Sequence, residues 1–275
     1  MESLVVGGGC FMNCLANGKI IKLTPFKNVG VSFAAEDSGN AIGAALVVAR
    51  KMNIHVNCVG LSSNLGPTYS DALIGEILEK MQLRYEQPDN IFEDTVNLLK
   101  QNKVVAWFQG ASEYGPRALG NRSILASPID VQMKDTINRK IKYRESYRPF
   151  APVINLDRKY LCFEDGEDSL SISSPVPYME KALPFKPDIG ERIPAVVHAD
   201  GTGRLQTVTE EGNPKLYQLL KTWEQSTGIP VLLNTSFNLN GEPIVCSPED
   251  AIRTFVTSGL DALVIGGYLL QKQSL

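Results

Sequence analysis

The chain has 275 residues, 27 Lys and Arg against 30 Asp and Glu, a formal net charge of −3 and 43% hydrophobic residues, values typical of a globular protein with one large or two smaller domains. No apolar run approaches the ~20 residues that span a bilayer, the first residues lack a signal-peptide pattern, and the slight acidity gives no general affinity for nucleic acid. The five cysteines are odd in number and lack zinc-ligand spacing, so we expect reduced thiols and a cytoplasmic protein.

The first predicted elements surround a glycine turn. A β-branched run at 4–6 is followed by three glycines at 7–9 and then by a segment of helical character. This order allows backbone N–H groups to approach a phosphate or ribose, although an ordinary tight turn explains the glycines equally well. Residues 29–33 predict a second strand and 41–52 a helix. Asp37 lies just ahead of this helix, where it would be an N-cap or, alternatively, a ligand of a metal or of a phosphate-bound water.

The middle of the chain predicts a boundary between two units. Residues 61–69 are rich in Gly, Pro and Ser, as linkers are. Residues 71–81 and 91–101 predict amphipathic helices, and 103–108 predict a strand that opens the second unit. The boundary therefore falls within residues 60–98.

Residues 109–150 form a basic segment. It holds eight Lys and Arg and four acids, so its net charge is +4 while the rest of the chain carries −7. Such a segment in an acidic protein attracts small, dense anions. Arg117, Arg122 and Arg148 adjoin Pro or Ser, where the backbone is restrained, and guanidinium groups on such turns suit phosphate or carboxylate.

A helix is also predicted within this segment. Met133, Ile137 and Ile141 recur every four residues, which indicates a buried helical stripe. The neighbouring charges have a simpler interpretation as a solvated helix face. That interpretation fits Lys134 and Arg139, but not the arginines on the turns.

The last part of the chain predicts more strands and a polar rim. We expect a strand–turn–strand unit, a helix, a buried strand and a final strand, at residues 196–208, 215–226, 231–233 and 262–267. Ser247 and Pro248 mark another helix start. Hydroxyl and amide side chains crowd residues 234–238, at the end of the buried strand, as at binding rims of α/β folds.

Seven ordered blocks of the chain resemble the O-carbamoyltransferases of the nodulation-factor and antibiotic-tailoring type. The blocks are GGGCFMNCLANG, EDSGNAIGAAL, EYGPRALGNRSILASP, KYRESYRPFAP, HADGTGRLQTV, LLNTSFNLNGEPIVCSPEDA and SGLDALVIG. The resemblance implies an α/β (α+β) chain. Residues 1–60 would be the closing part of an actin-like (ASKHA, ribonuclease H-like) ATPase-fold domain, 61–97 a linker with helices, and 98–275 a YrdC-like twisted-sheet domain with helices.

The resemblance also implies an activity. The YrdC-like domain would make carbamoyl-adenylate from carbamoyl phosphate and ATP, and the other domain would pass the carbamoyl group to a hydroxyl of a small-molecule acceptor in natural product biosynthesis. Adenylation needs charge neutralisation and in-line placement rather than a protein nucleophile, which agrees with the lack of a Ser–His–Asp signal.

Candidate residues for each role follow. The catalytic residues, which would hold the phosphates, are Arg117, Lys142, Arg148 and Arg204. The substrate- and nucleotide-binding residues are Gly7, Gly8, Gly9, Asn13, Arg122, Arg144, His198, Asn234, Ser236 and Asn238. Asp37 matches the family's metal-ligand aspartate. The expected metals are Mg²⁺ with ATP and Fe²⁺, manganese or zinc at the transfer site.

The chain departs from the family in one respect. The family's earlier half supplies a metal-binding His-x-x-x-His, and this sequence contains no such pair. We therefore expect an incomplete transfer site and a partner, either the N-terminal half as a separate chain or a second copy. A non-catalytic nucleotide-binding module is the alternative, but the retained anion-binding residues favour an enzyme. A tRNA-modification factor would need a basic face, and the chain outside the basic segment is acidic.

Overall fold

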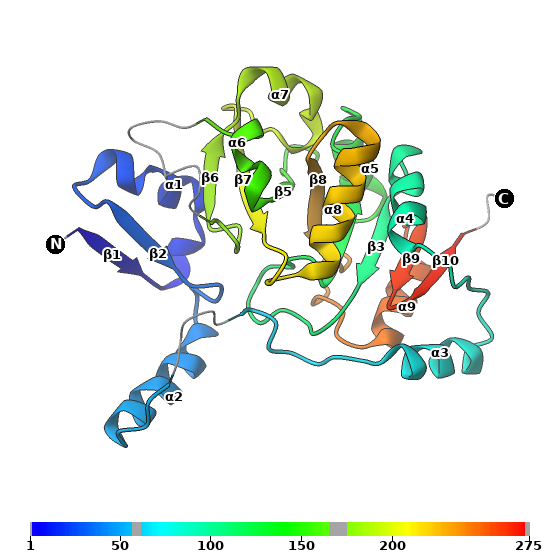
Figure 1. Cartoon of the computed structure of the whole chain (residues 1–275), viewed down its shortest axis with the longest axis horizontal. Helices are drawn as coiled ribbons and strands as arrows, with labels where there is room; N and C mark the ends of the chain where they lie inside the picture. The colour runs from blue at the N-terminus through cyan, green and yellow to red at the C-terminus, as the bar shows by residue number, and fades with distance from the viewer. Residues whose placement is uncertain (1, 57–61, 165–174, 273–275) are drawn as a thin grey trace.

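The computed structural model describes residues 2–56, 62–164 and 175–272. They form an α/β protein with a small parallel sheet near the N-terminus and a large mixed sheet with helices on both faces (Figure 1). The α/β class predicted from the sequence is therefore confirmed. No helix in these ranges is long and apolar enough to cross a membrane.

The first unit contains the small sheet. Strands β1 (Ser3–Val6) and β2 (Asn28–Val31) pair in parallel. Between them run the short 3-10 helix η1 (Gly9–Met12) and helix α1 (Cys14–Leu23), so the expected order of strand, glycine turn and helix is confirmed. Helix α2 (Gly39–Lys51) has no buried residue and projects away from the rest of the molecule (Figure 1).

The large sheet has the strand order β10-β9-β3-β4-β8-β5-β7-β6 within the described residues. Its strands are β3 (Val105–Phe108), β4 (Arg122–Ala126), β5 (Ala151–Asn155), β6 (Lys181–Pro184), β7 (Thr202–Val208), β8 (Val231–Ser236), β9 (Ala262–Ile265) and β10 (Tyr268–Gln271). The pairs β3·β9 and β5·β7 are parallel and the others antiparallel. The inner strands are buried along almost their whole length because helices cover both faces.

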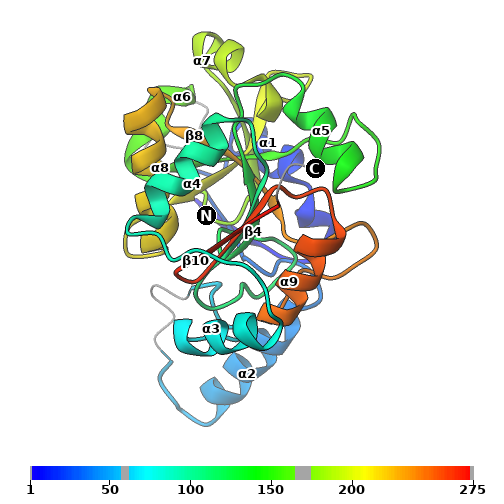
Figure 2. The same cartoon turned by 90° about the vertical axis from the view of Figure 1, so that its right-hand side faces the viewer.

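Two groups of helices cover the large sheet. Helices α3 (Asp71–Lys80), α5 (Met133–Lys140) and α9 (Pro248–Thr257) contribute to one core, and α4 (Ile91–Lys100) and α8 (Pro214–Thr227) to the other. Figure 2, which views the sheet from its edge, shows α4 and α8 on one side and α5 and α9 on the other. The two helices predicted near the segment 61–97 are α3 and α4, and both contribute buried residues to the cores of the large unit. Shorter helices are η2 (Leu156–Arg158), α6 (Lys159–Cys162), α7 (Pro187–Arg192) and η3 (Pro194–Val196).

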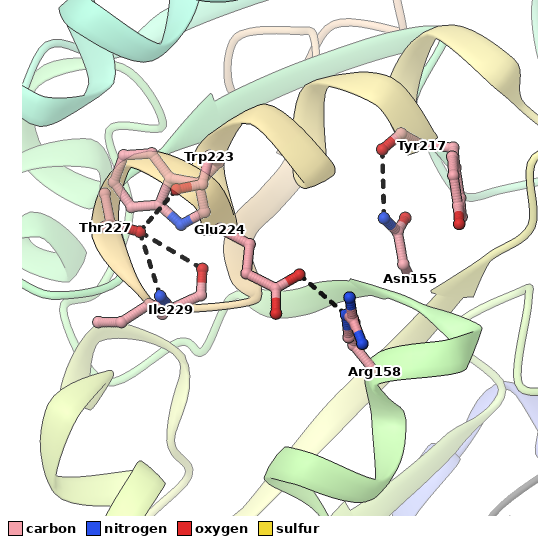
Figure 3. A network of polar contacts seen from close by, with 7 residues as sticks. All are labelled: Asn155, Arg158, Tyr217, Trp223, Glu224, Thr227 and Ile229. Atoms are coloured by element: carbon pink, nitrogen blue, oxygen red, sulfur yellow. Dashed lines mark hydrogen bonds and ion pairs between the residues drawn. The ribbon is translucent and has the colours of Figure 1, made fainter.

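Helix α8 shows how a helix is fixed to the sheet. Asn155, at the end of β5, donates from Nδ2 to the carbonyl oxygen of Tyr217 at 3.2 Å, and Arg158 Nε donates to Glu224 Oε2 at 3.0 Å (Figure 3). Trp223 is completely buried between helix and sheet. At the end of the helix, Thr227 Oγ1 donates to the carbonyl oxygen of Trp223 at 2.8 Å.

The first unit packs against the edge of the large sheet. Helix α1 lies along β6, where Asn17 Nδ2 donates to the carbonyl oxygen of Glu180 at 2.9 Å. In return, the buried Lys181 donates from Nζ to the carbonyl oxygen of Val29 at 3.2 Å. The two units are therefore joined by directed hydrogen bonds as well as by apolar contacts.

The predicted first strand of the unit at 196–208 is wrong. Instead, η3 ends at Val196, and a tight turn follows in which the His198 N–H donates to the carbonyl oxygen of Thr202 at 2.8 Å. Pro194 starts the 3-10 turn, because its fixed φ suits a helical turn. Only the second predicted strand, β7, forms, and it pairs with β5 and β6.

Candidate active site

A cavity of about 300 Å³ opens where the loop before β4, the turn after α5, β7 and the end of β8 meet. It is lined by Pro116, Arg117, Ala118, Lys142, Arg144, Arg148, Pro149, Met179, Arg204, Thr235, Ser236, Asn238, Leu239, Asn240 and Gly241. Five of these side chains are cationic, and no acidic side chain of the described residues lines the cavity. The cavity therefore suits a compact anion.

The loop that carries Arg117 is held at both ends by one carboxylate. Glu113 Oε1 accepts hydrogen bonds from the backbone N–H groups of Leu119 at 2.6 Å and Asn121 at 2.8 Å. Burial raises the pKa of Glu113, and these hydrogen bonds oppose that rise. Only glycine suits the turn between Glu113 and Leu119 at position 115, because the φ of Gly115 is +107° and a side chain there would meet the carbonyl oxygen of Phe33 at 2.7 Å. Arg117 is thus presented to the cavity from a closed loop.

Lys142 connects the turn after α5 to the end of β8. Its Nζ lies within hydrogen-bonding distance of the carbonyl oxygen and hydroxyl of Ser236 and of the carbonyl and amide oxygens of Asn238, at 2.5–3.2 Å. An ammonium group has only three protons, so these four oxygens compete for it. Burial, with repulsion from Arg144 and Arg148, lowers the pKa of Lys142 to about 7.

The other cations of the cavity also disfavour one another's charged forms. Burial and then repulsion from Arg117 lower the pKa of Arg204 to about 10, and burial and then Arg148 lower that of Arg144 to about 10. Burial lowers the pKa of Arg117 as well. None of the ion pairs among the described residues involves a cation of this cavity. The positive charge is left uncompensated, as expected for a site that binds a multiply charged anion.

The structure brings together all four residues predicted to hold phosphates and three of the ten predicted to bind substrate or nucleotide. The seven that line the cavity are Arg117, Lys142, Arg144, Arg148, Arg204, Ser236 and Asn238. They come from four separate segments of the chain, so their convergence was not imposed by sequence proximity.

Arg122 lies outside the cavity and has a structural environment. It is 0% exposed, and its guanidinium group stacks at 3.6 Å from the ring centroid of Phe108. Its Nη atoms donate to the carbonyl oxygens of Gln109 at 2.8 Å and Pro67 at 3.1 Å, and to two further carbonyls. Arg122 therefore fastens the segment before α3 to the sheet.

Asn234 and His198 do not line the cavity either. Asn234 is 0% exposed and donates from Nδ2 to Gln206 Oε1 at 2.7 Å, while Gln206 donates to the carbonyl oxygen of Leu119 at 2.7 Å. These hydrogen bonds connect β8, through Gln206 of β7, to the loop that carries Arg117. His198 Nδ1 lies 3.0 Å from Thr202 Oγ1, in the turn before β7.

The predicted residues of the first unit do not line the cavity. Gly7 and Gly9 flank Gly8, whose N–H donates to the carbonyl oxygen of Ala35 at 2.5 Å, and Asn13 is the N-cap of α1. The N-cap of α2 is Ser38, so Asp37 does not have that role. No group of three or more His, Cys, Asp or Glu among the described residues could hold a metal ion. The described residues therefore supply no complete metal site around Asp37.

Sequence reasoning missed some lining residues. Thr235 near the end of β8, with Asn240 and Gly241 after it, belongs to a polar run of which only parts were selected. Met179 carries no chemical signal in the sequence, because an apolar side chain at this position is indistinguishable from a core residue.

The comparisons with known proteins identify two family matches. The family described as carbamoyltransferase C-terminus matches residues 96–272, and carbamoyltransferase N-terminus matches residues 1–46. Nodulation protein NolO of Bradyrhizobium diazoefficiens is 39% identical over 99% of this chain and 50% of its own length. The 3'-hydroxymethylcephem-O-carbamoyltransferase of Amycolatopsis lactamdurans is 34% identical over 98% of this chain and 49% of its own.

An uncharacterized protein of Synechocystis, sll1178, is 38% identical over 99% of this chain and 48% of its own length. The chain thus spans about half the length of the curated relatives it matches. Among solved structures, a crystal structure of full-length HypF in its phosphate- and nucleotide-bound form gives a TM-score of 0.44 at 18% identity, over 70% of this chain and 22% of that one.

Proposed function

Because this chain belongs to the carbamoyltransferase family, we propose that its cation-lined cavity makes carbamoyl-adenylate from carbamoyl phosphate and ATP, for transfer to a hydroxyl of a small-molecule acceptor. The observation that carries this proposal is the convergence of five cationic side chains, without an acid, on a cavity of about 300 Å³. Both substrates present phosphate groups, and both react at a phosphorus or carbonyl centre that such a cavity would surround.

The proposed chemistry balances in two displacements. Water attacks the phosphorus of carbamoyl phosphate, the bond from phosphorus to the carbamoyl oxygen breaks, and carbamate, inorganic phosphate and a proton result. A carbamate oxygen then attacks the α-phosphorus of ATP, and pyrophosphate leaves. Each step accumulates charge on phosphoryl oxygens, so fixed cations and in-line placement supply the catalysis.

The residues of the cavity divide by their chemistry. Arg117, Lys142, Arg148 and Arg204 would hold phosphate groups through charge-assisted hydrogen bonds, which contribute about 1.5–3 kcal/mol each. A cavity of about 300 Å³ is at the small end of ligand sites, so it suits the reacting phosphates, with the adenosine extending outward. The hydroxyl groups of Thr235 and Ser236 are neutral polar groups in the lining and would orient the carbamoyl amide.

Two further parts of the proposal concern what lies outside this chain's cavity. Mg²⁺ would enter with ATP, as it usually does when bound to substrate phosphates. Asp37 would be one ligand of a transfer-site metal such as Fe²⁺ only if other polypeptide supplied the rest, so we derive no step through such a metal. Val47 and Val48 of helix α2, and Met52 directly after it, are at least 54% exposed, a surface suited to a partner that carries the remaining part of the N-terminal domain.

The test is pyrophosphate release from ATP by the purified chain, with and without carbamoyl phosphate. We expect release that depends on carbamoyl phosphate and that falls at least about tenfold in Arg148→Ala. Arg139→Ala is the matched control, because Arg139 is an exposed arginine of α5 in the same basic segment but does not line the cavity. Absence of release in a folded chain that binds ATP would reject the proposal in favour of a non-catalytic nucleotide-binding module.

A further inference from the structure

Asn138 is a buried amide beneath the turn that carries two cations of the cavity. It lies in the last turn of α5, is 0% exposed and does not line the cavity. We propose that Asn138 is a positioning residue that sets Arg144 and Arg148 for phosphate groups. The inference rests on the proposed function only for the identity of the substrate; the anion binding that it concerns is measured separately.

The contacts of Asn138 reach both arginines. Its Oδ1 accepts a hydrogen bond from Arg144 Nε at 2.7 Å. Its Nδ2 donates to the carbonyl oxygens of Arg148 at 3.1 Å and Ser146 at 3.3 Å. Its backbone carbonyl oxygen accepts from the Arg144 N–H at 3.1 Å. One residue therefore holds the side chain of Arg144 and the backbone from which Arg148 extends.

These contacts require an amide. The site needs one acceptor for Arg144 Nε and two donors for the carbonyl oxygens, a combination that asparagine supplies and that leucine and aspartate lack. Because Asn138 is neutral, it directs the Arg144 guanidinium group without compensating its charge. An aspartate would form an ion pair and reduce the positive charge that the cavity presents to an anion.

The turn needs such an anchor. Burial, and then repulsion from Arg148, lowers the pKa of Arg144, and most residues from 143 to 149 are exposed. Tyr143, between Lys142 and Arg144, has a φ of +44°, a conformation that residues with a side chain adopt only when the surroundings hold them. With Asn138 in place, the cations are arranged before the anion binds, so the anion does not have to order them.

The test is the affinity of the full chain for inorganic pyrophosphate, by titration calorimetry. We expect Asn138→Leu to weaken binding at least about tenfold, because both arginines lose their fixed positions. Asn155→Leu is the matched control, since Asn155 is also a buried asparagine, with one hydrogen bond to Tyr217 (Figure 3), and is not part of the cavity. It should lower the melting temperature but change the affinity less than about twofold.

Two comparisons separate positioning from general destabilisation. In an Arg144→Ala background, the effect of Asn138→Leu on affinity should shrink, because Asn138 acts through that arginine. Additive effects, or an unchanged affinity in Asn138→Leu, would overturn the inference. If Asn138→Leu does not fold, Asn138→Asp is measured instead, since it keeps an acceptor for Arg144 and should still weaken binding.

Failure of the proposed function gives a different result from failure of this inference. A chain that binds pyrophosphate, loses that binding in Asn138→Leu and yet makes no pyrophosphate from ATP would reject the proposed function alone. A wild-type chain that does not bind pyrophosphate would reject the inference.

Discussion

At the scale of residues, Lys142 is a cation that burial disfavours and that an anion would favour. Its pKa is lowered to about 7 by burial and by the neighbouring arginines. An anion in the cavity would raise this pKa, so binding above neutral pH should take up a proton. We predict that pyrophosphate affinity falls as pH rises through about 7, and that Lys142→Met binds more weakly and with a flatter pH profile.

The measurement is calorimetry in buffers of different ionisation enthalpy. Pyrophosphate titrates as well, so the difference between wild type and Lys142→Met isolates the contribution of the lysine. An identical pH profile in both proteins would contradict the assignment.

Lys142 should also make the stability of the ligand-free protein depend on pH, with a sign opposite to that of the affinity. Lysine in an unfolded chain has a pKa of ~10.4, whereas the folded value is about 7. Between these values the unfolded state binds more protons, so the free energy of unfolding of the ligand-free protein should rise with pH. Denaturant titrations at several pH values should show this contribution in wild type but not in Lys142→Met.

Two arginines, the partly buried Arg204 and the fully buried Arg122, should respond in opposite ways to substitution by methionine. Arg204 lies in the cavity near Arg117 without a carboxylate, so Arg204→Met should maintain or raise the melting temperature while weakening pyrophosphate binding at least about tenfold. Arg122→Met should instead remove the hydrogen bonds of several buried carbonyl oxygens and cost about 3 kcal/mol or more of stability. Calorimetric melting of both variants checks this pair, and a similar loss of stability in both would contradict it.

At the scale of elements, the sequence predicted helices better than strands. The stripe of Met133, Ile137 and Ile141 is buried as expected, because a four-residue period is specific to a helix. Strands β4 and β5 were missed. β4 begins with Arg122, whose guanidinium group is held mostly by carbonyl oxygens from other segments of the chain, and β5 contains Pro152, which usually argues against an inner strand.

Glycines in two helices offer a test of how the units are joined. A side chain on Gly18 of α1 would overlap the carbonyl oxygen of Ala182 in β6, whereas Gly43 of α2 has open space around it. Gly43→Ala should stabilise its helix by up to about 1 kcal/mol, the usual gain in helix propensity. Gly18→Ala should instead weaken the contact between α1 and β6. Hydrogen exchange should then be faster in α1 of Gly18→Ala only, and equal protection in both variants would contradict this packing.

At the scale of the whole molecule, the candidate site combines what local sequence shows with what only topology shows. Arg117 and Arg148 were predictable because each adjoins a proline in a basic segment. That Arg204 and Ser236 join them depends on the sheet order β8-β5-β7, which places distant segments together. Asn234 had the same chemical signal as Ser236 and lies on the same face of β8, but it sits two residues further into the sheet, where it is buried and bonded to Gln206.

Phosphorus-31 NMR of the chain incubated with ATP, Mg²⁺ and carbamoyl phosphate tests most directly whether the cation-lined cavity makes carbamoyl-adenylate. We predict that pyrophosphate and a new adenylate signal appear together, only when both substrates are present, that inorganic phosphate from carbamoyl phosphate accompanies them, and that Arg148→Ala reduces the pyrophosphate and adenylate signals. The formation of ADP and phosphate, or unreacted ATP in a chain that binds pyrophosphate, would contradict the proposal that the cation-lined cavity makes carbamoyl-adenylate.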